Sequence, residues 1–98
     1  MNAFFVSRIR VKDPAKMKEY AQATGPTIAA HGGQLAVRGA MVKALLGEAD
    51  DHQVTSVVTF PDLAAVEAWF TSPEYVQHTA LRDAAGDMQF VAYEVPSA

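Results

Sequence analysis

The chain has 98 residues, 50% of them hydrophobic and 19% charged, with a net charge of −3 and no cysteine. This composition fits one globular domain with a packed core, and it excludes general disorder, disulfides and cysteine metal sites. The 8 basic and 11 acidic residues form no block of one sign, so we expect no nucleic-acid partner.

The first residues, Met1–Asp13, contain Arg8 and Arg10 and are too short for a signal peptide or a membrane span. We therefore expect a cytoplasmic protein with no membrane partner. Residues 1–98 are predicted to form a single domain, of which 96–98 are a short tail.

The first part of the chain has the pattern of a strand followed by a helix. Ala3–Val11 is rich in aromatic and β-branched residues, and its alternation predicts one side with Phe5 and Ile9 and another with Arg8 and Arg10. Asp13-Pro14 is an N-cap followed by proline at the first helical position, which predicts a helix from Pro14 to about His31. The helix should end at Gly32-Gly33 in a left-handed cap. Its expected inward stripe is Met17, Tyr20, Thr24 and Ile28.

Two further strands are predicted before the second helical region. In Gln34–Gly39, alternation places Leu35 and Val37 towards the helices and Arg38 on the opposite side. Ala40–Glu48 resumes the extended pattern, so Gly39 is predicted to be a bulge within one long strand. Gln53–Phe60 is the third strand.

The second helical region is marked by good capping residues. Asp62 is an N-cap, and Leu63, Val66 and Phe70 form the expected apolar stripe. Ser72-Pro73-Glu74 combines a hydroxyl cap, a proline and an acid, and predicts a further helical segment that ends near Gly86. Asp87–Val95 is predicted to be the last strand.

The order β-α-β-β-α-β is that of the ferredoxin-like split motif, an α+β fold with a four-stranded antiparallel sheet and its helices on one face. The other face must carry Phe4, Val6 and, by alternation, Val57. A sheet face this apolar usually finds a second layer. We therefore predict a homodimer in which two copies meet face to face across a two-fold axis.

The stretch Asp13–Ala40 and the stretch Phe60–Arg82 together resemble the family called domain of unknown function 1330. The most specific likeness lies in Arg38-Gly39 after the Gly-Gly turn, and in Trp69 followed by Ser72-Pro73-Glu74-Tyr75. The resemblance implies a dimeric α/β barrel, in which two ferredoxin-like sheets join. Relatives in that superfamily include cofactor-free monooxygenases, muconolactone-isomerase-like enzymes, haem-degrading enzymes and sensing domains.

Two arginines are the main candidates for binding a ligand. Arg38 and Arg8 are both predicted to point to the dimer-facing surface, where a guanidinium can hold a carboxylate in a fork of hydrogen bonds. The alternative for both arginines is a structural ion pair with Glu48, Glu94 or an aspartate.

Aromatic residues of the helices are the other candidate ligand contacts. Tyr20 and Tyr75 can donate hydrogen bonds to a ligand or pack in the core, and Trp69 and Phe70 can wall a pocket or pack the second helix on the sheet. Ser72 is explained as an N-cap.

The histidines give no metal motif. His31, His52 and His78 lack helical metal spacing, so no metal site is predicted. His78 is the candidate for acid–base work because it neighbours the Ser72–Tyr75 segment, or it is simply an exposed helix residue.

Three hypotheses for function follow. The first is a module that binds a small acidic or aromatic molecule without a cofactor, through Arg38, Arg8, Trp69 and Tyr75. The second is a cofactor-independent enzyme of the monooxygenase, isomerase or lyase kind that the resemblance implies, in which Arg38 anchors an acid and His78 or Tyr20 moves a proton. The third is a structural dimer. A pair of titratable groups in an apolar pocket would favour the enzyme, and an apolar pocket without one would favour binding.

Overall fold

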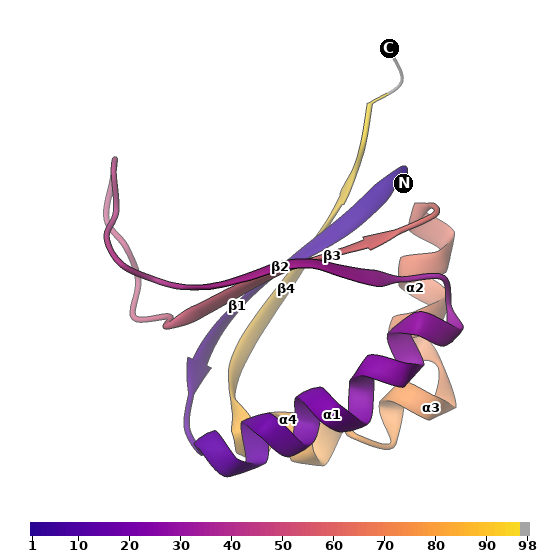
Figure 1. Ribbon diagram of the computed structural model, residues 1–98, viewed down its shortest axis with the longest axis horizontal. Helices are drawn as coiled ribbons and strands as arrows, with labels where there is room; N and C mark the ends of the chain where they lie inside the picture. The colour runs from indigo at the N-terminus through magenta and orange to yellow at the C-terminus, as the bar shows by residue number, and fades with distance from the viewer. Residues whose placement is uncertain (97–98) are drawn as a thin grey trace.

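The computed structural model describes residues 1–96, and its strands form an antiparallel sheet with the order β2-β3-β1-β4. The strands are β1 (Ala3–Val11), β2 (Gln34–Ala40), β3 (Val54–Phe60) and β4 (Gly86–Glu94). The helices are α1 (Pro14–Ala30), α2 (Leu63–Thr71), α3 (Pro73–Val76) and α4 (Thr79–Ala85). All of them lie on one face of the sheet (Figure 1). The ferredoxin-like α+β fold is therefore confirmed. The predicted tail includes residues 97 and 98, which lie outside the described part of the chain.

The core lies between the sheet and α2, and its centre is a stack of aromatic rings. Phe5 of β1 and Trp69 of α2 are nearly parallel, with centroids 5.2 Å apart and an interplanar angle of 6°. Trp69 is only 1% exposed, whereas its neighbour Phe70 is 43% exposed. Trp69 thus takes the inward place that the predicted stripe gave to Phe70, and it packs α2 on the sheet.

The predicted helix caps are confirmed. The Asp13 carboxylate accepts a hydrogen bond from the amide of Lys16 at 3.1 Å, and Asp62 accepts one from Ala65 at 2.8 Å. Gly32 has a φ of 77°, the left-handed conformation that favours glycine at a helix C-terminus.

Ser72 joins the end of α2 to the start of α3. Its Oγ accepts a hydrogen bond from the amide of Tyr75 at 3.3 Å and donates one to the carbonyl of Trp69 at 2.7 Å. The cap therefore serves both helices.

The helical segment predicted from Ser72 to Gly86 is two helices and not one. The amide of His78 donates to the carbonyl of Tyr75 at 2.9 Å, an i−3 bond that tightens the last turn of α3. Gln77 and His78 then separate α3 from α4, which begins at Thr79.

The bulge in β2 lies at Ala36 and not at Gly39, which pairs regularly with Thr55. Leu35 pairs with Val58 and Val37 pairs with Val57, so Ala36 between them is an extra residue. An extra residue reverses the alternation of the side chains that follow it. The predicted orientation of β2 after Leu35 is therefore wrong.

The predicted strand over Ala40–Glu48 is also wrong, because β2 ends at Ala40 and residues 41–53 form a loop. The loop extends away from the body of the molecule and curves to the side of the sheet opposite the helices (Figure 1). Three of its apolar side chains are almost fully exposed, Val42 at 86%, Leu45 at 90% and Leu46 at 97%. An extended apolar segment of this kind has no neighbouring strand in the described chain to pair with.

A hydrogen bond between two tyrosines connects α1 to α3. The hydroxyls of Tyr20 and Tyr75 are 2.8 Å apart, and Tyr75 also accepts a hydrogen bond from Arg82 of α4 at 3.3 Å. Burial and the hydrogen bond with Tyr75 raise the pKa of Tyr20 above its ordinary value. The folded state therefore favours the neutral phenol at this position.

We predict that Ser72→Ala lowers the free energy of unfolding by about 1 kcal/mol, because the amide of Tyr75 loses its cap. Urea unfolding followed by circular dichroism measures the loss. Thr71→Ala is the matched control, because the Thr71 hydroxyl only bonds back to the carbonyl of Glu67 within its own helix and should contribute little. Equal stability of the Ser72 variant and the wild type would contradict the capping role.

Tyr20→Phe should lower the free energy of unfolding by about 1 kcal/mol at pH 7, because one buried hydrogen bond is lost. In the wild type, the folded state keeps the Tyr20 proton while the unfolded state releases it above about pH 10. The contribution of this hydroxyl is thus fully present below pH 10 and declines above it, by at most about 1.4 kcal/mol per pH unit. Urea unfolding at pH 7 and pH 11 should show the two proteins converging at the higher pH. A constant difference would contradict the raised pKa.

Candidate functional site

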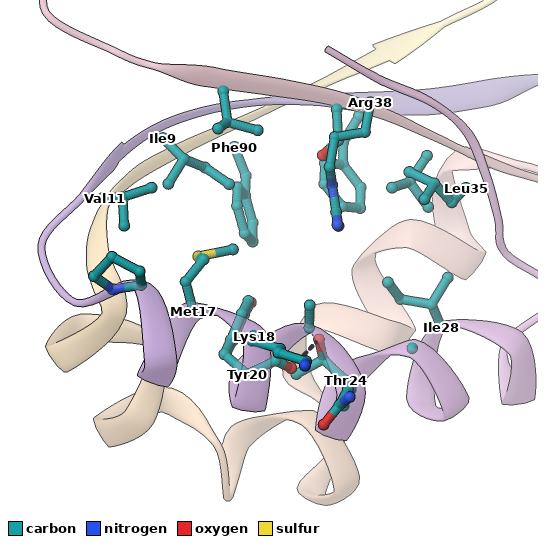
Figure 2. Close-up of a pocket in the computed structure, with 18 of the residues that line it drawn as sticks. Ile9, Val11, Met17, Lys18, Tyr20, Thr24, Ile28, Leu35, Arg38 and Phe90 are labelled. Carbon is teal, nitrogen blue, oxygen red and sulfur yellow. Dashed lines mark hydrogen bonds between the residues drawn. The ribbon is translucent and has the colours of Figure 1, made fainter. Parts of the chain in front are cut away.

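A cleft of about 650 Å³ lies between α1 and the inner face of the sheet. Figure 2 shows α1 below the cleft and the sheet above it. In this fold α1 approaches α4 and α3 more closely than any strand, and the cleft lies on the side of α1 that faces the sheet. The walls are largely apolar and include Ile9, Met17, Ile28, Val58, Trp69 and Phe90.

Arg38 lies in this cleft. Its side chain leaves β2 and extends into the space above α1, between Leu35 on one side and Phe90 on the other (Figure 2). The predicted orientation towards the open face is therefore wrong, because the bulge at Ala36 pairs Arg38 with the inward-facing Ser56. Within residues 1–96, Arg38 forms no ion pair, so the carboxylates proposed as its partners are not bonded to it.

The charge in the cleft is positive. Lys18 of α1 and Arg38 both line it, and no aspartate or glutamate is among the lining residues that the structure describes. An apolar cavity with two cationic side chains attracts anions, because its walls offer no competing carboxylate.

Neutral polar groups occupy the floor and the roof of the cleft. On α1, the ring of Tyr20 lines the floor, and its hydroxyl is engaged with Tyr75 behind the helix. On the sheet, the Oγ atoms of Ser56 and Ser7 are 2.5 Å apart, and Ser56 lines the cleft. The cleft thus offers a hydroxyl from the sheet in addition to the two cations.

Arg8 lies on the opposite face of the sheet, as its alternation predicts. It pairs with Asp50 at 2.6 Å, in a polar hollow of about 410 Å³ that also contains Arg10, His52 and Asp87. The hydrogen bond with His52 and the charge of Arg8 hold the pKa of Asp50 below its ordinary value. Arg8 and Arg38, predicted to share one surface, are therefore separated by the sheet.

The remaining site candidates are only partly brought together. Trp69 and the ring of Tyr20 line the cleft with Arg38, whereas Tyr75 is 0% exposed and does not line it. His78 occupies the N-cap position of α4 and does not line the cleft.

In residues 1–96, no three histidine, aspartate or glutamate side chains are grouped in a way that could hold a metal ion. No described helix has both the length and the apolar character needed to cross a membrane.

The cleft residues that the sequence did not reveal include Lys18, Ser56 and Phe90. Ser56 could have been recognised as a site candidate, because it lies with Val58 and Phe60 on the inward side of its strand, where a hydroxyl is unusual. Lys18 follows Met17 of the inward stripe and had no distinguishing feature.

The open face of the sheet carries a continuous apolar row. Val37, Val57, Val6 and Val91 are successive cross-strand partners over all four strands. Beside this row, the rings of Phe4 and Tyr93 stack with centroids 5.2 Å apart.

Solved structures with the same fold include three that are informative. The protein of unknown function RPA0582 from Rhodopseudomonas palustris is 19% identical, with a TM-score of 0.75 over 98% of this chain and 83% of that one. SnoaB, a cofactor-independent oxygenase from Streptomyces nogalater, is 17% identical, with a TM-score of 0.68 over 99% and 95%. A dimeric ferredoxin-like protein of unknown function from Thermobifida fusca is 15% identical, with a TM-score of 0.65 over 97% and 92%. At these identities, the likeness shows the fold alone.

A search of curated protein sequences finds no significant match. A family model, however, matches residues 2–95, which is nearly the whole chain. This match agrees with the resemblance in Arg38-Gly39 and in the Ser72–Tyr75 segment. The chain belongs to the family described as domain of unknown function (DUF1330).

Proposed function

We propose that this protein binds a small organic anion, an apolar carboxylic acid, in the cleft between α1 and the sheet. The observation that carries the proposal is Arg38, a cation in a largely apolar cleft that contains no carboxylate among its described lining residues. An arginine fork matches a carboxylate in geometry as well as charge, and Lys18 adds a second positive charge. The apolar walls suit the hydrocarbon part of such an acid, and the rings of Trp69 and Phe90 suit an aromatic one.

Binding without turnover fits the cleft better than catalysis. Besides its two cations, the ionisable group in the cleft is Tyr20, whose hydroxyl is engaged with Tyr75 and whose pKa is raised. A general base needs a pKa near the working pH and reach to the ligand, and His78 lies outside the cleft. SnoaB is described as an oxygenase, and that activity is its own. If this protein consumed oxygen in the presence of a bound acid, the enzyme hypothesis would replace the binding hypothesis.

The proposal extends to a homodimer in the cytoplasm, formed through the open face of the sheet. The valine row leaves Val37 59% and Val91 37% exposed in the single chain, and a second copy would cover both. The loop 41–53 curves towards the same side (Figure 1), so its exposed Leu45 and Leu46 are placed to pack on the partner. The similar structure from Thermobifida fusca is described as dimeric, which supports this arrangement. We propose neither a nucleic acid nor a membrane as a partner.

We predict that the wild type binds 4-phenylbutyrate more tightly than the uncharged 4-phenylbutan-1-ol, and that Arg38→Lys weakens binding of the acid about tenfold. Lysine keeps the charge and loses the planar fork, and a charge-assisted pair is worth roughly 1.5–3 kcal/mol. Isothermal titration calorimetry measures both affinities, and the melting temperature of the variant should barely change.

Arg8→Lys is the matched control, because the same substitution on the other face of the sheet leaves the cleft intact. Equal binding of the acid and the alcohol by the wild type would refute anion binding. Unchanged affinity of Arg38→Lys for an acid shown to occupy the cleft would remove Arg38 from the site.

For the homodimer, we expect light scattering at micromolar concentration to give twice the mass of one chain, and Val91→Asp to give a monomer. A carboxylate in the valine row would have to lose its water on association. Val76→Asp is the matched control, because Val76 of α3 is exposed to a similar extent, 47%, on the helical side. A monomeric wild type, or equal effects of the two substitutions, would count against this interface.

A further inference from the structure

Two serine hydroxyls face each other directly beneath the sheet. Ser7 of β1 and Ser56 of β3 are cross-strand partners, and their Oγ atoms are 2.5 Å apart. Ser7 is 1% exposed and Ser56 is 6% exposed, so both are buried. Of the two, Ser56 lines the cleft and Ser7 does not.

A count of protons shows which hydroxyl is free. The pair has two hydroxyl protons, and only one of them can lie between the two oxygens. The Ser7 oxygen also accepts a hydrogen bond from the backbone amide of Ser56 at 3.1 Å. If Ser56 donated to Ser7, the Ser7 proton would be buried without any acceptor among the described residues, which is costly. The favoured arrangement has Ser7 donating to Ser56, which leaves the Ser56 proton free at the surface of the cleft.

We infer that the Ser56 hydroxyl donates a hydrogen bond to a neutral oxygen of the ligand whose carboxylate Arg38 holds. This inference rests on the proposed anion binding and narrows the ligand to an apolar acid with a second oxygen acceptor, such as an oxo acid. The neutral donor and the charged donor are neighbours, because Ser56 and Arg38 are cross-strand partners on β3 and β2.

The two donors act at different depths. Ser56 lines the cleft from β3 of the sheet. Arg38, in contrast, extends from the sheet towards α1 (Figure 2). A ligand that satisfies both therefore has its carboxylate at the guanidinium and its second oxygen against β3. The apolar part of the ligand would then contact Ile9, Met17 and Phe90. These residues lie on one side of Arg38, and Leu35 lies on the other (Figure 2).

The test compares two acids by isothermal titration calorimetry: 4-phenylbutyrate, and 4-oxo-4-phenylbutyrate, in which a carbonyl replaces the methylene next to the ring. The wild type should bind the oxo acid about three- to tenfold more tightly, as for one neutral hydrogen bond. Ser56→Ala should abolish this preference while it leaves the affinity for 4-phenylbutyrate within about twofold, because the backbone amide at position 56 keeps its bond to Ser7.

Thr55→Ala is the matched control, because Thr55 neighbours Ser56 on β3 and faces away from the cleft, so this variant should keep the preference. If Ser56→Ala does not fold by circular dichroism, Ser56→Cys replaces it with the same expectation, since a thiol is a weak donor. The role of Ser56 would be overturned if the wild type bound the two acids equally, or if the Ser56 variant still preferred the oxo acid. Either result would leave the proposed anion binding intact. Failure of both acids to bind the wild type would overturn both proposals.

Discussion

One extra residue in β2 determines what the cleft can do. With Ala36 bulged out, Arg38 pairs with Ser56 and shares the inner face with Leu35. In a regular strand, Arg38 would instead pair with Thr55, and its guanidinium would lie on the open face. A β-bulge costs little in a strand at the edge of a sheet, where one side has no ladder to disrupt, and β2 is such a strand.

The cleft is also maintained by the way α1 is held. In a ferredoxin-like fold, a helix usually closes directly on the sheet and fills the space with apolar side chains. Here the buried Tyr20 faces Tyr75, and Thr27 accepts a hydrogen bond from the indole nitrogen of Trp69 at 3.0 Å. These polar contacts fasten α1 to the other helices, so its position does not depend on filling the cleft. The cavity costs stability that a packed interior would supply, and this cost is consistent with the proposed binding of a ligand there.

The features that depend on local chemistry could be predicted from the sequence. The caps at Asp13, Asp62 and Ser72 were predictable because short polar side chains before a helix have few other roles, and the strands of the centre were predictable from their alternation. The bulge at Ala36 was not, because Gln34–Arg38 alternates regularly and the glycine that usually marks a bulge stands three residues later. The loop after Ala40 was predicted wrongly for a different reason. Its apolar residues have the pattern of a strand, but within residues 1–96 of the single chain they do not pair with any strand.

The same bulge connects the two faces of the sheet. Turning Arg38 into the cleft places Val37 opposite Val57, which completes the valine row over all four strands of the open face. Without the extra residue, Val37 would enter the cleft and the arginine would lie within the apolar row, where a charge has no partner and is costly to bury. One register shift thus gives the inner face its cation and the outer face its hydrocarbon surface. A change in the pairing of β2 would alter the cleft and the open face together, so the proposed ligand binding and the proposed assembly depend on the same few hydrogen bonds.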